Sequence, residues 1–293
     1  MTRTLSQLQP ALLASFKRIL QEGKLSHAYL FSGGFGSFEM AIYLAQSRFC
    51  QQLQDNLPCG ECRSCRLISQ GEFTDVKVVE PTGQTIKTET IRQLLGDFYR
   101  SGFEGARQVF IIKDCEKMHP NAANSLLKAI EEPQIEAYIL LLTSDESKVL
   151  TTIKSRTQIF HFPKNTAYLI ELAEKEGLLK SQATLVANLA DSPSELLSLC
   201  QDRLTFSLIQ ACQDLVTYLF NDKGLAYLQV ARLVSLASDK KEEEKSFGFL
   251  TLLLSQEMTN PKARDLLAKV AVSKEMWQRH VHFQNALEYM VLS

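Results

Sequence analysis

The sequence predicts a parallel α/β domain that begins with a strand–loop–helix unit of the P-loop type and is followed by two all-helical domains. Three observations predict this fold class. Short apolar segments of strand type alternate with helical patterns as far as Pro163, a glycine-rich turn follows the first strand, and only helical periodicity continues after Thr166. With 293 residues, 45% of them hydrophobic, the chain is long enough for two or three domains.

The α/β domain begins with a helix, a strand and a second helix. Residues 9–22 place apolar side chains at helical spacing, with Pro10 near the start and Gly23 just past the end. Residues 28–32 form a short apolar segment before the glycine-rich turn, and residues 38–50 restore the helical period. This is the order of elements in which a phosphate-binding loop occurs.

Four more strands and two more helices complete this domain. Strands are predicted at residues 76–79, 109–112, 137–143 and 158–162, and helices at residues 88–99 and 121–130. Strands that alternate with helices indicate a mainly parallel sheet covered on both faces. We therefore expect an α/β domain at residues 1–164, a small helical domain at 165–203 and a larger one at 204–293. The charged segment 239–245, DKKEEEK, is interpreted as a solvated connection between helices.

The glycine-rich stretch 29–40, YLFSGGFGSFEM, is similar to a phosphate-binding loop that has lost its chemistry. A working loop reads G-x-x-x-x-G-K-[ST], in which backbone N–H groups and Lys bind phosphates and the hydroxyl binds Mg²⁺. Aligned from Gly33, this template meets a phenylalanine, a carboxylate that repels phosphate and a thioether that cannot bind Mg²⁺. An ordinary glycine-rich turn is the alternative. The residues of this degenerate loop are Gly33, Gly34, Gly36, Phe38, Glu39 and Met40.

Four of the seven cysteines form a cluster with the spacing C-x8-C-x2-C-x2-C, which suits tetrahedral Zn²⁺. A redox pair and an iron–sulfur cluster are alternatives, but a redox C-x-x-C usually stands alone and the common cluster spacings differ. A site closed by four thiolates leaves no position for a catalytic water, so the expected role is structural, in a module at about residues 50–66. The predicted ligands are Cys50, Cys59, Cys62 and Cys65. The other three cysteines, Cys115, Cys200 and Cys212, are expected to be buried.

The composition of the chain indicates its cellular location and the kinds of partner that it can bind. No apolar run approaches the roughly 18 residues of a membrane span, and the N-terminus lacks the apolar block of a signal peptide, so we expect a cytoplasmic protein without a membrane partner. The net charge of −1 gives no overall attraction to nucleic acid, so DNA contact is expected to be local or shared with partner proteins.

Three further segments carry a family resemblance. They are IIKDCEKMHPNAANSLLKAIEEP at 111–133, LLTSDESKVLTTIKSR at 141–156, and the cysteine insert. Together with HAYLFSG at 27–33 they closely resemble bacterial clamp-loader subunits of the AAA+ superfamily. The similarity is dense from about residue 27 to residue 163, and the degenerate loop narrows it to a subunit type that resembles the ATPase subunits without being an ATPase. Beyond residue 163 the family implies a helical lid and a helical collar.

The resemblance also assigns positions in two other motifs. Where ATPase members carry an acidic pair for Mg²⁺ and water, this chain has Lys113 and Asp114, so this degenerate Walker B element is damaged as well. Arg156 stands at the family's S-R-C motif, whose arginine reaches the ATP site of the neighbouring subunit, although Thr157 replaces the cysteine. Thr143 occupies a polar sensor position. The helix end from Lys128 to Pro133 is interpreted as a charged helix terminus without a catalytic role.

The resemblance implies a non-ATPase subunit that helps to load a sliding clamp onto primed DNA during replication and donates an arginine finger to a neighbour. The implied partners are the clamp-loader ATPase subunits (gamma/tau), the delta subunit, the sliding clamp and, through the complex, primer-template DNA. The implied cofactor is structural zinc, with no ATP bound by this chain. Two alternatives are an ATPase in its own right and a zinc-containing nucleic-acid-binding protein that acts alone; Glu39 and Lys113 argue against the first, and the lack of a basic, aromatic-rich patch argues against the second.

Overall fold

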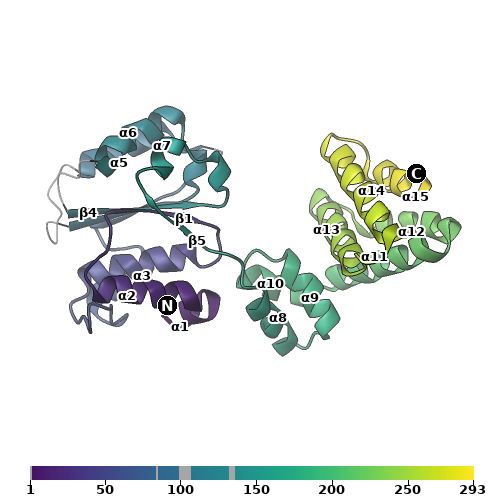
Figure 1. Cartoon of the computed structure of the whole chain (residues 1–293), viewed down its shortest axis with the longest axis horizontal. Coiled ribbons are helices and arrows are strands. Elements are labelled where there is room, and N and C mark those ends of the chain that lie inside the picture. The colour runs from purple at the N-terminus through teal and green to yellow at the C-terminus, as the bar shows by residue number, and fades with distance from the viewer. Residues whose placement is uncertain (1, 84, 99–106, 132–135) are drawn as a thin grey trace. The chain divides into compact units, whose positions relative to one another are not determined.

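The computed structural model describes residues 2–83, 85–98, 107–131 and 136–293. The chain divides into two compact units, Met1–Asn165 and Thr166–Ser293 (Figure 1). In the described part of the chain, no helix is both long enough and apolar enough to cross a membrane.

The first unit is built on a five-stranded parallel sheet with the order β2-β3-β4-β1-β5. All five strands lie where the sequence predicts them, and the α/β class with helical domains is confirmed. Their bounds are β1 Ala28–Ser32, β2 Val76–Val79, β3 Arg107–Ile112, β4 Glu136–Thr143 and β5 Gln158–His161. The order puts β4 at the centre, next to β1, so both strands are shielded on their two faces and can be apolar throughout.

Helices cover both faces of the sheet (Figure 1). On one face lie α1 Thr2–Leu8, α2 Pro10–Gln21 and α3 Ser37–Phe49, and on the other α5 Thr88–Phe98, α6 Pro120–Glu131 and the short α7 Thr151–Lys154. Each face of the sheet has its own hydrophobic core, because successive side chains of a strand point to opposite faces. Tyr29 and Phe31 of β1 pack in the core with α2 and α3, whereas Leu30 packs in the core with α5 and α6. The first unit also contains α4 Arg63–Gln70 and two 3-10 turns, η1 Cys115–Lys117 and η2 Glu146–Lys148. The last residue of the predicted helix 88–99, Tyr99, lies outside the described residues.

The second unit contains only helices within its described residues, as the sequence predicts. They are α8 Thr166–Lys175, α9 Lys180–Leu189, α10 Pro193–Gln201, α11 Arg203–Asn221, α12 Lys223–Leu236, α13 Lys240–Gln256, α14 Pro261–Gln278 and α15 Phe283–Leu292. The core between α13, α14 and α15 is aromatic: the Phe247 ring lies 5.7 Å from Trp277 and 5.4 Å from Phe283. The further division at residues 203 and 204 stays a prediction.

The interpretation of residues 239–245 as a connection between helices is wrong. Asp239 is the N-cap of α13, and its side chain accepts a hydrogen bond from the backbone N–H of Glu242, whose carboxylate accepts one from the N–H of Asp239 in return. This capping box satisfies N–H groups that have no partner in the first helical turn. The charged run is therefore the solvated first part of a helix.

The glycine-rich loop is fastened to the end of the first unit. The Gln9 side chain, only 6% exposed, donates from Nε2 to the carbonyl oxygens of Phe35 (2.8 Å) and Pro163 (2.6 Å). Gly33 has φ of +107°, its N–H donates to the Thr143 carbonyl, and a Cβ at this position would lie 2.3 Å from the Phe162 carbonyl oxygen. The loop is thus required by the packing of the fold.

Replacing Gly33 with alanine is expected to lower the free energy of unfolding by about 2–4 kcal/mol, because the new methyl group meets backbone and the positive φ disfavours any side chain. Gly34→Ala is the matched control: its added Cβ meets nothing within 4 Å, and we expect a change within about 0.5 kcal/mol. Urea unfolding of both variants measures the difference. Equal losses would show that the loop does not depend on Gly33.

Candidate functional site

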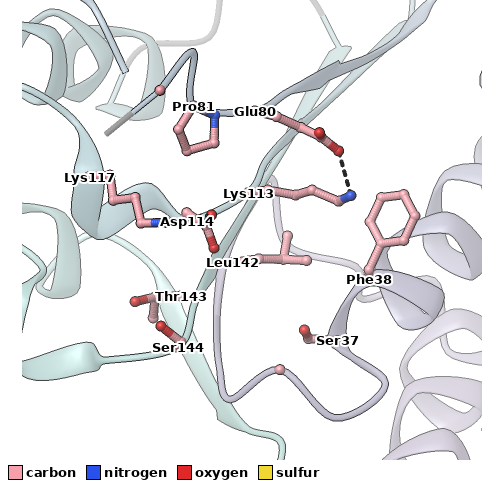
Figure 2. Close-up of a pocket in the computed structure, with 12 residues that line it drawn as sticks. Ser37, Phe38, Glu80, Pro81, Lys113, Asp114, Lys117, Leu142, Thr143 and Ser144 are labelled. Atoms are coloured by element: carbon pink, nitrogen blue, oxygen red, sulfur yellow. Dashed lines mark hydrogen bonds and ion pairs between the residues drawn. The ribbon is translucent and has the colours of Figure 1, made fainter. Parts of the chain in front are cut away.

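A cavity of about 430 Å³ lies at the edge of the sheet where β1, β2, β3 and β4 end (Figure 2). Open α/β sheets commonly bind ligands at this carboxyl edge, where polar residues that follow several parallel strands converge. The lining residues are Gly34, Ser37, Phe38, Glu80, Pro81, Gly83, Lys113, Asp114, Lys117, Leu142, Thr143 and Ser144. The cavity therefore occupies the place where a nucleotide would bind in this fold.

The charged groups in the cavity neutralise one another. The Lys113 ammonium lies 2.5 Å from the Glu80 carboxylate and 4.1 Å from the centre of the Phe38 ring (Figure 2). Lys117 pairs with Asp114 at 3.0 Å. Two cations and two carboxylates leave the lining without net charge, and the cation nearest the loop already has an ionic and an aromatic partner. A polyphosphate would find no unpaired cation among these residues.

The first turn of α3 decides which loop residues face the cavity. The helix begins at Ser37, one residue after Gly36, and both Ser37 and Phe38 line the cavity. Met40 is fully buried in the core between α3 and the sheet, and Glu39 is absent from the lining. Of the three loop residues that depart from the motif, Phe38 alone therefore lines the cavity, and Met40, which aligns with the Mg²⁺-binding hydroxyl, packs in the core instead.

The polar residues at or shortly after the ends of β3 and β4, Asp114, Thr143 and Ser144, form hydrogen bonds with residues close to them. Asp114 has a left-handed φ of +48° at the N-cap of the η1 turn, and its backbone carbonyl accepts a hydrogen bond from the Lys117 N–H (2.9 Å). The Thr143 hydroxyl accepts from the Asp145 N–H (3.1 Å), and the Ser144 hydroxyl donates to Glu116 Oε1 (2.8 Å). These polar groups stabilise the turns after β3 and β4.

Sequence reasoning missed Glu80, Lys117, Ser144 and Ser37 as lining residues. Glu80 follows β2 directly, and Ser144 follows β4. Both residues could have been predicted from the sequence, because residues that follow parallel strands meet at the carboxyl edge of the sheet. The pairing of Glu80 with Lys113 needed the observed strand order, in which β2 and β3 are neighbours.

The predicted metal ligands lie together. Cys50 follows α3, Cys62 is the N-cap of α4, Cys65 lies in the first turn of α4, and the four sulfur atoms lie within 4.8 Å of one another. Sγ of Cys50 lies 3.5 Å from that of Cys59 and 3.9 Å from that of Cys62. A tetrahedral Zn²⁺ with bonds of ~2.3 Å separates its sulfur ligands by about 3.8 Å. The arrangement therefore fits a four-thiolate metal site.

Backbone N–H groups surround these sulfurs. Cys50 Sγ accepts from the N–H of Gln52 and of Cys59, and Cys59 Sγ accepts from the N–H of Glu61 and of Cys62. Burial raises the pKa of the Cys62 thiol, but hydrogen bonds from backbone N–H groups and neighbouring thiols outweigh it and lower this pKa to about 6. Of the remaining cysteines, Cys115 and Cys212 are buried and Cys200 is half-buried.

Arg156 lies at the opposite edge of the sheet from the cavity. It precedes β5, whose first residue Gln158 pairs with Tyr29 near the start of β1, and it is absent from the cavity lining. The intervening β1 has five residues, which at ~3.3 Å each span about 17 Å. The Arg156 guanidinium contacts Glu131 at the end of α6 and the Thr152 carbonyl (3.1 Å). Glu132 and Pro133, in the predicted charged helix end, lie outside the described residues.

Comparisons with known proteins agree with this architecture. The family model described as DNA polymerase III, delta subunit matches residues 8–166. The DNA polymerase III subunit delta' of Bacillus subtilis is 30% identical over 256 residues, which cover 86% of this chain and 77% of that protein. Subunit delta' of Pseudomonas aeruginosa is 37% identical over 135 residues, 45% of this chain and 41% of that protein.

Two further comparisons reach beyond these relatives. The DNA polymerase III subunit tau of Escherichia coli is 36% identical over 155 residues, 52% of this chain and 24% of that protein. A crystal structure of a DNA polymerase III gamma subunit-related protein from Thermotoga maritima shares the fold, with a TM-score of 0.53 at 18% identity over 95% of this chain and 96% of that one. The family match over more than half of the chain and the Bacillus relative together establish that this chain belongs to the family of DNA polymerase III delta-prime subunits.

Proposed function

We propose that this chain is a non-hydrolysing subunit of a bacterial clamp loader, which acts in the cytoplasm to place the sliding clamp on primed DNA during replication. Its part in the chemistry is to donate Arg156 to the ATP site of a neighbouring ATPase subunit. One observation carries this proposal: the cavity in the nucleotide position is neutralised by its own residues, whereas Arg156 lies at the other edge of the sheet.

The cavity chemistry supports a chain that is not an ATPase by itself. ATP hydrolysis needs a cation on the outer phosphates, a hydroxyl and a carboxylate for Mg²⁺, and a group that orients water. Here Lys113 is paired with Glu80, and Asp114 is paired with Lys117. Phe38, in the first turn of α3, places an aromatic ring against Lys113. Such a subunit contributes to a DNA polymerase III holoenzyme without its own nucleotide chemistry.

The position of Arg156 supports action on a neighbour. A guanidinium keeps its charge and offers several N–H donors, so it stabilises the charge that develops on a transferred phosphoryl group. Arg156 is 38% exposed and about 17 Å of strand separates it from its own cavity, so any nucleotide that it serves belongs to another chain.

The proposed partners, the roles of the two helical domains and the bound metal follow from the family to which the chain belongs. The proposed partners are the gamma/tau ATPase subunits, the delta subunit and the sliding clamp, with primer-template DNA reached through the complex. Residues 165–203 would form a lid and residues 204–293 a collar that joins the ring. Cys50, Cys59, Cys62 and Cys65 would hold a structural Zn²⁺ that fastens the segment between α3 and α4.

Purified protein is expected to contain about one zinc per chain, because four thiolates close one tetrahedral site. Elemental analysis of the protein and of Cys62→Ser tests this, and the variant should lose the metal. Cys200→Ser, half-buried and remote from the cluster in sequence, is the control that should keep it. A stable protein without metal would contradict the assignment.

The isolated chain is expected not to bind ATP with Mg²⁺ at concentrations below about 1 mM, because two carboxylates balance the two cations of the cavity lining and the loop lacks the lysine and the hydroxyl of a phosphate-binding loop. Equilibrium dialysis with labelled ATP measures this, with an ATPase subunit of the complex as the positive control. Saturable binding in the micromolar range would revive the alternative of an ATPase.

Arg156→Ala in the reconstituted complex is expected to slow hydrolysis at the adjacent ATP site by about a thousandfold, because the transition-state charge loses its guanidinium. DNA- and clamp-stimulated phosphate release and clamp loading are the measurements. Arg107→Ala is the matched control, because Arg107 also forms an exposed ion pair at the amino edge of the sheet, with Glu136. Unchanged hydrolysis and loading in Arg156→Ala would remove the proposed role.

A further inference from the structure

We propose that Glu131 is a positioning residue for Arg156, so that the helix end of α6 prepares the guanidinium for a phosphate on a neighbouring chain. This inference rests on the proposed function of Arg156 and adds a second residue to it. Glu131 is the last residue of α6, in the segment that sequence analysis interprets as a charged terminus without a catalytic role.

Three acceptors hold the guanidinium on two of its three nitrogens. Nε donates to Glu131 Oε1, and Nη1 donates to the Thr152 carbonyl (3.1 Å) and to the Ser155 hydroxyl (3.2 Å). A guanidinium has five N–H groups in a rigid plane. Among the described residues, Nη2 has no acceptor, and its two N–H groups remain available for phosphate oxygens.

Both sides of this contact are anchored in the fold. His27 Nε2 lies 2.8 Å from the carbonyl oxygen of Ile130, which only accepts, so Nε2 carries the proton and ties the end of α6 to the start of β1. Ile130 itself is buried. On the other side, the Arg156 N–H donates to the Ile153 carbonyl at the end of α7, and Ile153 is buried as well. Glu131 and Arg156 therefore extend from fixed backbone.

The pair is too exposed to act mainly through stability. The side chains of Arg156 and Glu131 are 38% and 46% exposed, and ion pairs of this kind contribute little to folding. Their effect is instead to restrict a long, flexible side chain to one orientation before the neighbour arrives, which lowers the entropy lost on contact. The Arg107–Glu136 pair has similar exposure, 49% and 44%, which makes it a matched comparison.

The test uses the reconstituted clamp-loader complex with Glu131→Ala, Glu131→Gln, Arg156→Ala and the double variant Glu131→Ala/Arg156→Ala. Glu131→Ala is expected to lower kcat of stimulated ATP hydrolysis by about tenfold with KM for ATP unchanged, because loss of orientation acts in the transition state. Glu131→Gln should recover most of the rate, because its amide oxygen still accepts from Nε. In the Arg156→Ala background, Glu131→Ala should have no further effect.

The outcomes separate this inference from the proposed function. An equal loss from Glu131→Ala with and without Arg156, or a fall in the thermal unfolding midpoint that Gln does not rescue, would show a structural role and overturn the inference. A normal or raised rate in Glu131→Ala, in a complex that Arg156→Ala impairs, would overturn the inference alone. A normal rate in Arg156→Ala would overturn the proposed function itself. Glu136→Ala should leave kcat unchanged.

Discussion

The parallel direction of all five strands is the constraint on which the rest of the first unit depends. It brings the residues that follow β1, β2, β3 and β4 to one edge and the residues that precede β4 and β5 to the other. Lys113 and Glu80 therefore meet at the first edge, and Arg156 and Glu131 meet at the second. The two edges do not share side chains, so a substitution in the cavity leaves the contacts of Arg156 in place. The proposed function requires this separation.

The charged side chains of the cavity balance one another. Two cations without neighbouring carboxylates would repel each other in the cavity, although solvent weakens this repulsion because the charged side chains are partly exposed. Glu80 beside Lys113 and Asp114 beside Lys117 balance these cations, and the Phe38 ring lies against the Lys113 ammonium. The loop itself survives because packing requires it: Gly33 lies against the Phe162 carbonyl, and Gln9 bridges Phe35 and Pro163.

The local sequence pattern was enough to predict the strands, but it could not predict contacts between residues that are far apart in the chain. The strands at Ala28–Ser32 and Val76–Val79 could be predicted to the residue, since buried parallel strands are continuous apolar runs between turns. The start of α13 was missed because its charges were weighed and the spacing from Asp239 to Glu242, a capping box, was not. The burial of Met40 in the core was not predicted, because a motif alignment does not show which side chains of a helix face the sheet. The contact of Glu131 with Arg156 joins residues 25 positions apart, which periodicity does not detect.

The modest strength of the Glu131–Arg156 pair suits the role that we propose for Arg156 at the ATP site of a neighbouring subunit. In water, an exposed pair is screened and worth little, so it does not compete strongly with an incoming phosphate. In the proposed complex, a neighbouring subunit would exclude water from the site and lower the effective dielectric, which would strengthen the attraction of Arg156 for both its carboxylate and the phosphate. A buried pair would have held Arg156 too firmly, and an unpaired arginine would have had to lose its rotational freedom on every contact. Partial exposure thus combines orientation before binding with availability during it.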